Sequence, residues 1–314
     1  MMEKARKIFK NRRSATIFLI VILAVPTIHW FVFWLYVNMS SFVLAFKAQT
    51  GDWSLINFQL FWDSLKNPYG GTVGGAIINT LKYWSVSILV VFPLSIGIAY
   101  FIYKKIRFYK FFRVMFFFPS IITGIILVSV YTQLIAPGGI WDSILKIFDK
   151  SVPLQGYFNP DAAAPNRATN AILIYSVLTG FGTNVILIGS AMSRVPDSVL
   201  EAAQIDGCGP FREIIQLILP LIWPTLSTII LLSLTGFFSA SGPILLFAPD
   251  GESNTTTLSF WIFKQVYGLG EFGQTGGSQN YGLVSATGMV FTLVWLPVVL
   301  TVRWLMEKIP TVEY

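Results

Sequence analysis

Six long apolar runs divide the chain and set its expected secondary structure. Each run has about 20 or more mostly apolar residues, which is the length a helix needs to cross the hydrocarbon core of a bilayer. The six predicted helices cover residues 15–37, 78–103, 111–135, 170–192, 219–247 and 281–305. Prolines in or beside these runs predict kinks. The pattern indicates an all-α polytopic membrane protein.

Composition supports a membrane environment. Hydrophobic residues make up 54% of the 314-residue chain and charged residues only 12%, with a mean hydropathy of +0.66. Such a chain has too few charges to cover a soluble globule of its size. Basic residues followed by an apolar run are also typical of a signal peptide. We expect an uncleaved first span instead, because residues 15–37 exceed a signal core and no small-residue cleavage site follows them.

The charges predict an orientation. Most of the 22 Lys and Arg residues fall in segments 1–14, 104–113, 194–212 and 303–308. Basic loops remain in the cytoplasm, so both termini are expected there. The net charge of +7 fits loops that face an anionic leaflet and requires no nucleic-acid partner. A single cysteine, Cys208, excludes an intrachain disulfide and a cysteine-based metal site.

Residues 194–213, between the fourth and fifth spans, predict an elbow of two short helices. Ser198 and Glu201 have the spacing of a capping box, so a helix is expected to run to Asp206 and to stop at Gly207. Gly209 and Pro210 suit the start of a second helix. The expected docking surface consists of Glu201, Ala202, Ala203, Asp206, Gly207 and Pro210. The alternative is an ordinary cytoplasmic loop with a capped helix.

These residues resemble the EAA signature of permease subunits in binding-protein-dependent ABC importers. The matching positions are Glu201, Ala202, Ala203, Asp206, Gly207, Leu219 and Pro220, while Cys208 stands where Ala is usual. The resemblance covers roughly the whole chain: residues 79–81 (Asn-Thr-Leu) and 255–258 (Thr-Thr-Thr-Leu) are similar to segments of carbohydrate-uptake permeases. Within that class the chain resembles the first permease of the maltose and glycerol-phosphate type.

The resemblance implies a type I ABC importer permease fold with six transmembrane helices. It also implies that residues 194–213 form a coupling helix that sits in a cleft of an ATPase subunit. The implied partners are a second homologous permease, two ATPase subunits that carry ATP and Mg, and an extracytoplasmic solute-binding protein. The implied location is the bacterial cytoplasmic membrane, and the implied solute is a sugar or oligosaccharide.

The resemblance also suggests a division of the chain. Residues 1–14 would be a cytoplasmic N-terminus, residues 15–77 the first helix with an outer segment, residues 78–305 a five-helix transporter core, and residues 306–314 a cytoplasmic C-terminus.

Motifs that the sequence lacks narrow the range of possible functions. The chain has no Gly-Lys dipeptide and therefore no phosphate-cradling G-x-x-x-x-G-K-[ST] loop, so ATP must be hydrolysed by another subunit. We expect no enzyme activity and no bound cofactor in this chain. An ion-coupled secondary transporter is the main rival, but it would carry ionisable residues in the middle of its spans. Only His29 lies clearly within a span, because Lys82 and Arg303 are near span borders. Glycerol-phosphate-type solutes remain open, although no Arg or Lys lies at mid-span to hold a phosphate.

A sugar pathway needs aromatic faces and amide or hydroxyl groups. The fourth and fifth predicted spans offer both. The candidate pathway residues are Phe181, Asn184, Thr235, Phe238 and Ser239. Routine packing is the competing interpretation, because small polar residues at helix contacts and Phe against lipid are common in membranes.

Overall fold

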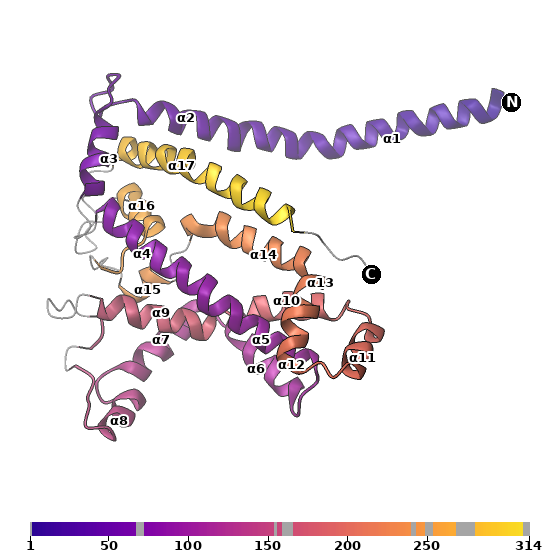
Figure 1. Ribbon diagram of the computed structural model, residues 1–314. Coiled ribbons are helices and arrows are strands. Elements are labelled where there is room, and N and C mark those ends of the chain that lie inside the picture. The colour runs from indigo at the N-terminus through magenta and orange to yellow at the C-terminus, as the bar shows by residue number, and fades with distance from the viewer. Residues whose placement is uncertain are drawn as a thin grey trace. The chain divides into compact units, whose positions relative to one another are not determined.

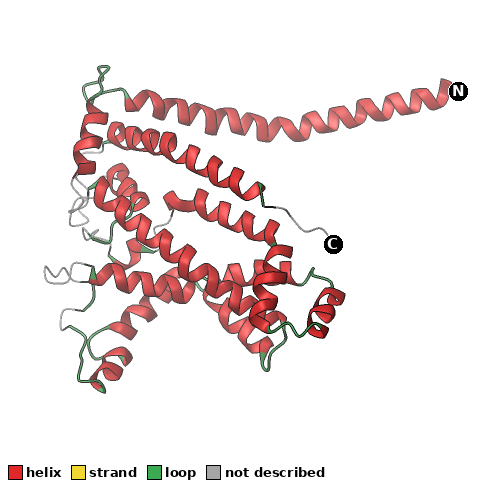
Figure 2. Ribbon diagram, viewed as in Figure 1, coloured by secondary structure: helices red, strands yellow, loops and turns green. Residues whose placement is uncertain are grey.

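The protein is helical throughout the part that the structure, a computed structural model, describes. This part comprises residues 2–66, 72–153, 156–158, 166–239, 243–248, 254–267 and 280–309, without the side chains of residues 2–13 and Ser239. Figure 2 shows helices joined by loops and no strand in this part. The only extended pairing of the described residues is an isolated antiparallel bridge between Lys47 and Trp53. The predicted all-α class is confirmed for these residues. The chain divides into two compact units: unit 1 is Met1–Phe61 with Asn280–Phe291, and unit 2 is Trp62–Gln279 with Thr292–Tyr314.

Unit 1 contains the first apolar span. Its helices are α1 (Met2–His29), η1 (Trp30–Leu35), α2 (Tyr36–Ala45), the start of α3 (Ile56–Lys66) and the start of α17 (Tyr281–Glu307). The first three follow one another without a break, and the apolar span covers Ser14–Ala45. The predicted end at residue 37 was wrong. Asn38 does not stop the helix, because its side-chain amide donates to the Trp34 carbonyl at 2.6 Å within the same helix.

A buried amide fixes the turn that follows α2. Asn57 is 2% exposed and donates to the carbonyls of Ala45, at 3.0 Å, and Lys47, at 2.8 Å. Gly282 of α17 lies so close that a Cβ there would be 2.5 Å from Asn57 Nδ2. These contacts hold the end of α2, the start of α3 and the start of α17 together.

Unit 2 carries the other helices. In chain order they are α4 (Val73–Val86), η2 (Ser87–Val91), α5 (Phe92–Tyr103), α6 (Tyr109–Ile121), α7 (Gly124–Ile135), α8 (Ile140–Lys146), α9 (Arg167–Thr179), α10 (Gly182–Met192), α11 (Asp197–Ile205), α12 (Pro210–Arg212), η3 (Glu213–Ile218), α13 (Leu219–Leu221), α14 (Trp223–Thr235), η4 (Gly236–Ser239), α15 (Ile244–Phe247) and α16 (Leu258–Tyr267). Figure 1 shows α11 and α12 near one end of this unit and α15 and α16 near the other.

Five helices of the described chain are long and apolar enough to cross a membrane, and a bent pair makes a sixth if it counts as one span. The bent pair, Pro210–Leu221 and Trp223–Phe238, turns by 79° between Pro220 and Pro224. Neither proline can donate a helical hydrogen bond, which accounts for the turn. The kink predicted at these prolines is therefore found, but the bent pair covers Pro210–Phe238 and not the predicted residues 219–247.

The third predicted span, residues 111–135, is also interrupted. Helix α6 ends at Ile121 and α7 begins at Gly124. Between them Ile122 and Thr123 have extended backbones, with ψ of 142° and 139°. The apolar span that passes the length test is Gly124–Lys146. Apolarity extends across the break, so hydropathy did not reveal it. Pro119, one of the prolines that predicted kinks, lies in the last turn of α6 just before the break.

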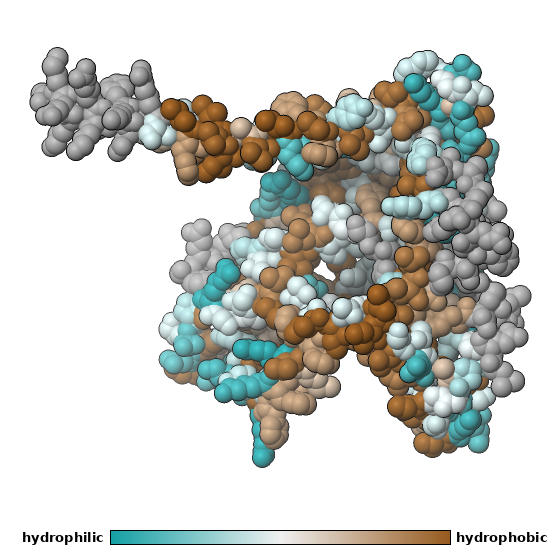
Figure 3. All heavy atoms as spheres, turned by 180° about the vertical axis from the view of Figure 1, so that it is seen from behind, coloured by the Kyte–Doolittle hydropathy of each residue, from teal (hydrophilic) through white to brown (hydrophobic). Residues whose placement is uncertain are grey.

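The main core of unit 2 lies where α5, α10, α11 and η3 meet. Its fully buried members include Ala99, Ile188, Met192 and Ile218. Large apolar side chains elsewhere remain exposed, and Figure 3 shows apolar residues in brown along most of the first span and over the long helices of unit 2. Such surfaces suit contact with lipid.

Two of the short motifs noted in the sequence meet in unit 2. Asn79 of α4 donates to the carbonyls of Asn254, at 2.7 Å, and Thr256, at 3.1 Å. The Thr80 hydroxyl accepts from the backbone N–H of Leu258 at 2.9 Å. Residues 79–81 and 255–258 thus form one bonded junction, which attaches the segment before α16 to α4.

Candidate functional site: a two-helix elbow between spans

Helix α11 is the first arm of the elbow. Its N-cap is Pro196, with φ −63° and ψ 137°, and no side chain caps the helix. The capping-box prediction was wrong. The extended Pro196 makes Asp197 the first helical residue, so Ser198 is already inside the first turn and does not occupy the capping position.

Helix α11 stops at Gly207, as the sequence predicted. Gly207 has φ +71°, the left-handed region, and Asp206 is the C-cap. The N–H of Cys208 bonds the Ala203 carbonyl at 2.9 Å, and the N–H of Gly207 bonds the Gln204 carbonyl at 3.0 Å. This pair of bonds is a Schellman motif, in which glycine avoids the steric cost that a Cβ brings.

The second arm also starts where the sequence placed it. Gly209 is the N-cap, with ψ 161°, and Pro210 is the first residue of α12. Pro at this position loses no helical bond, because the first N–H groups of a helix have no internal partner.

The elbow is attached to unit 2 on one side and open on the other. Leu200 is 7% exposed and packs into the core cluster with Val195. Glu201, Ala202, Asp206, Gly207 and Pro210 are exposed, and Ala203 is half-buried. The structure therefore places the predicted docking residues within one short segment and leaves nearly all of them accessible.

Two apolar side chains of the elbow were missed in the sequence. Ile205 is 87% exposed and Phe211 is 77% exposed. Helical spacing could have indicated Ile205: it follows Leu200 by five residues, which places it about 140° away from the buried face. Exposed apolar groups beside the acids Glu201 and Asp206 are typical of a surface that another protein covers.

A buried ion pair joins the second arm to α5. Glu213, 3% exposed, contacts Lys104 with 2.6 Å between Oε1 and Nζ. The same ammonium group lies 5.8 Å from the centre of the Tyr100 ring. The pair was not predicted, because an acid at the head of an apolar helix is only a weak signal in the sequence. It links the elbow directly to the end of a span.

The first two candidate pathway residues lie at the break between α9 and α10. Phe181 is the N-cap of α10, and its ring packs edge-on against Phe116 with centroids 5.4 Å apart. Asn184 is half-buried, and its side-chain amide bonds no other residue in the described ranges. Gly182 allows α10 to approach α6 closely, since a Cβ there would be 2.9 Å from the Phe116 carbonyl oxygen.

The other candidates lie at the end of α14, which packs against α10, and in η4, which follows it. The Thr235 hydroxyl donates to the Leu232 carbonyl at 3.0 Å. Phe238 lies 5.8 Å from the Trp295 ring. The side chain of Ser239 lies outside the described atoms.

An aromatic cluster supports this second group and was missed in the sequence. Phe237 stacks on Trp295 with centroids 4.1 Å apart, and Trp84 contacts both rings. The indole N–H groups of Trp84 and Trp295 bond the carbonyls of Ser233 and Leu234. Among the described residues, no three His, Cys, Asp or Glu side chains are grouped to hold a metal ion.

Comparison with known proteins shows the family of the chain. Residues 90–309 match the model of the binding-protein-dependent transport system inner membrane component. The chain belongs to this family. The matched range contains α11, the glycine stop, the ion pair and all five candidate pathway residues.

Other members of this permease family resemble the chain over most of its length. The arabinooligosaccharides transport system permease protein AraP of Bacillus subtilis is 25% identical over 85% of this chain and 81% of its own length. The sn-glycerol-3-phosphate transport system permease protein UgpA of Shigella flexneri is 25% identical over 77% of this chain and 72% of its own.

A solved structure has the same fold. It is described as a bacterial alginate ABC transporter in complex with an alginate pentasaccharide-bound periplasmic protein. The similarity covers 93% of this chain and 94% of that one, with a TM-score of 0.75 and 20% identity. At 93% of the chain, the similarity extends beyond the range that the family model matches.

Proposed function

We propose that this permease is one membrane subunit of an ATP-driven importer that takes up a sugar or oligosaccharide from an extracytoplasmic solute-binding protein. The observation that carries the proposal is the exposed elbow, which offers acids and apolar side chains to a partner while its buried side holds the spans. Relatives described as transporting arabinooligosaccharides and an alginate importer of the same fold support the solute class.

The elbow is the proposed coupling element. Glu201 and Asp206 would face basic groups of an ATPase cleft, and Ile205 and Phe211 would be covered there. Movement of the ATPase pair, which binds ATP and Mg, would reach α5 through the Lys104–Glu213 contact and turn the pore between its two access states. A second, homologous permease would complete the pore.

The proposal includes six membrane crossings, with the bent pair counted as one, and both termini in a bacterial cytoplasm. Cys208 tests this topology without any engineering, because it is the only cysteine and is partly accessible. In vesicles that carry the permease without its ATPase subunits, a membrane-impermeant maleimide should label Cys208 when the vesicles are inside-out and leave it unmodified when they are right-side-out. Equal labelling from the outer side would overturn the orientation.

The contacts of the basic residues near the ends of the spans bear on the charge of the solute. Lys82 bonds Asn166 at 3.3 Å, and Arg303 forms an ion pair with Glu307 at 2.8 Å. Arg303 is therefore balanced by an acid, while the ammonium group of Lys82 is bonded to a neutral amide. The glycerol-phosphate relative makes that solute the alternative, and competition between labelled oligosaccharides and glycerol 3-phosphate during uptake would distinguish the two.

Reconstitution of the whole complex in liposomes tests the mechanism. Uptake should require ATP on the cytoplasmic side and should survive collapse of proton and sodium gradients, and a His29→Phe variant should retain most of it. Glu201→Lys should leave the complex assembled but abolish solute-stimulated ATP hydrolysis, because like charges would meet in the ATPase cleft. Normal stimulation in this variant would remove Glu201 from the interface, and uptake driven by gradients without ATP would favour a secondary transporter.

A further inference from the structure

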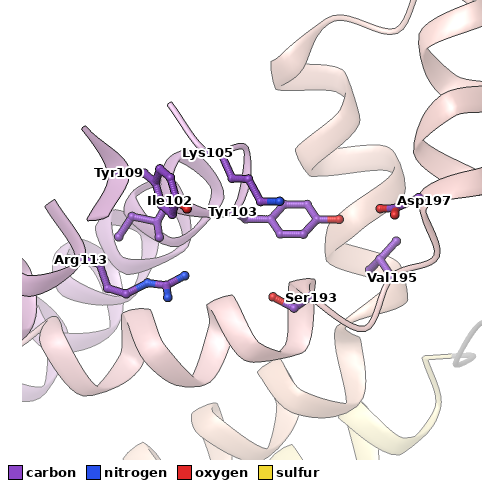
Figure 4. A pocket seen from close by; sticks show the side chains of 8 residues that line it. All are labelled: Ile102, Tyr103, Lys105, Tyr109, Arg113, Ser193, Val195 and Asp197. Atoms are coloured by element: carbon purple, nitrogen blue, oxygen red, sulfur yellow. The ribbon is translucent and has the colours of Figure 1, made fainter. Parts of the chain in front are cut away.

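A cavity of about 400 Å³ lies at the junction of α5, α6, α10 and α11. We call it the junction pocket. Its lining residues are Ile102, Tyr103, Lys105, Tyr109, Arg113, Ser193, Val195 and Asp197 (Figure 4). The volume is within the range of small-molecule sites, about 300 to 1,000 Å³. None of these residues belongs to the predicted docking surface or to the candidate solute pathway.

The charged side chains of the pocket are not paired with one another or with other described residues through ion pairs. The side chains of Lys105, Arg113 and Asp197 form no ion pair or hydrogen bond with any other described residue. Two cations and one acid leave the pocket with a single net positive charge. A ligand with one negative charge would therefore balance it, and a second negative charge would meet Asp197.

The polar groups are arranged for two kinds of contact. Arg113 presents a planar fork of donors that suits phosphate oxygens, and Lys105 adds a mobile ammonium group. Asp197 can only accept hydrogen bonds when ionised. In Figure 4 the Tyr103 hydroxyl points toward Asp197, away from the Arg113 side of the pocket. The ligand should thus carry an anionic end and a donor end.

The position of the pocket indicates where such a ligand comes from. Ile102 and Tyr103 are the last residues of the span Val73–Tyr103, and Ser193 directly follows the span Arg167–Met192. The pocket therefore lies at the level where two spans leave the apolar layer, and Ile102 and Val195 give it an apolar wall. Basic pockets between spans at this depth are suited to lipid headgroups.

We propose that the junction pocket binds the headgroup of a phospholipid, with the phosphodiester between Lys105 and Arg113 and the hydroxyl or ammonium end of the headgroup alcohol donating to Asp197. Phosphatidylglycerol and phosphatidylethanolamine have such donors. Phosphatidylcholine lacks one, and phosphatidic acid adds charge without an alcohol. Asp197 is the first residue of α11, so the bound headgroup also contacts the start of the elbow.

Native mass spectrometry of the delipidated complex, titrated with short-chain phosphatidylglycerol, tests the site. Arg113→Gln and Lys105→Gln should each weaken binding about tenfold, the effect of one charge-assisted hydrogen bond. Lys110→Gln is the matched control, because Lys110 belongs to the same basic segment without lining the pocket. Asp197→Asn should reduce the preference for phosphatidylglycerol over phosphatidylcholine.

Each outcome decides the assignment. Equal affinity of wild type and Arg113→Gln would overturn the site, and equal affinity for phosphatidylcholine would remove the role of Asp197. Inorganic phosphate or glycerophosphoglycerol that displaces the lipid at similar concentration would assign the pocket to a soluble phosphate. The measurement requires no transport, so its result is independent of the proposed import function.

Discussion

The Lys104–Glu213 contact gives the sharpest energetic prediction, because one partner is almost fully buried. Lys104→Met would leave the Glu213 carboxylate, whose side chain is 4% exposed, without its cation. The variant keeps the length and apolar stem of the side chain, so the loss of charge is the main change. We expect the complex to become less stable and its elbow to be held less firmly against α5.

The distance sets the size of the effect. At 2.6 Å and an effective dielectric constant of about 20, Coulomb attraction amounts to about 6 kcal/mol. Much of this offsets the desolvation of the two ions, and removal of one partner of a buried pair costs about 3 to 5 kcal/mol. The Lys104 side chain is 26% exposed, so water screens part of the contact and the lower value applies. With an unfolding entropy of about 2.1 cal/mol/K per residue, a chain of 314 residues shifts by about 1.5 °C per kcal/mol, so the unfolding midpoint should fall by roughly 5 °C.

Tryptophan fluorescence of the detergent-solubilised complex would follow unfolding, since the chain has 10 Trp residues. The double variant Lys104→Met with Glu213→Leu is the decisive comparison. An apolar pair of similar volume should recover most of the lost stability, because no buried charge remains. If the double variant is as unstable as Lys104→Met, or if Lys104→Met unfolds like wild type, the ion pair does not stabilise the elbow.

Two further predictions concern the elbow and the pathway. Gly207→Val should lose solute-stimulated ATP hydrolysis while Gly207→Asn keeps most of it. The reason is that the left-handed backbone costs about 1 to 2 kcal/mol for ordinary residues and Asn tolerates it better. Equal hydrogen exchange of residues 197–212 in both variants would contradict this prediction. Asn184→Leu should lower uptake while basal ATP hydrolysis persists, since a sugar hydroxyl would lose a bond worth about 1 to 3 kcal/mol. Phe238→Ala should act in the same direction if its ring stacks on the solute. Unchanged uptake in both, at equal expression, would assign the solute contacts to the partner permease.

The sequence predicted the turn of the elbow because that turn is decided locally. Gly207 is needed where the backbone enters the left-handed region, and Pro210 suits the first turn of a helix whatever surrounds it. The start of α11 was predicted incorrectly for an equally local reason: Ser198 has the right spacing, but the extended Pro196 already supplies the helix boundary.

Tertiary contacts explain what the pattern could not predict. Lys104 and Glu213 are far apart in sequence, and only the packing of η3 against α5 brings them together. The polar residue Asn38 suggested the end of a span, but its side-chain amide bonds a carbonyl of its own helix, and the helix continues. The break after Ile121 occurs inside an apolar run, where hydropathy does not distinguish one long helix from two.

The 79° bend separates a segment that leads to the elbow, Pro210–Leu221, from the longer helix α14. The first segment can act as a lever arm that moves the elbow. The segment Pro210–Leu221 is about 18 Å long at 1.5 Å per residue, and it meets α14 at the buried residue Ile222, 3% exposed. Beyond the bend, the Trp223 indole bonds the Met306 carbonyl at 3.4 Å, which braces that arm against α17. A rotation of about 10° around Ile222 would move Pro210 by about 3 Å, given that arm length. Small angular changes at the base of the fifth span thus correspond to displacements the size of a side chain at the docking surface.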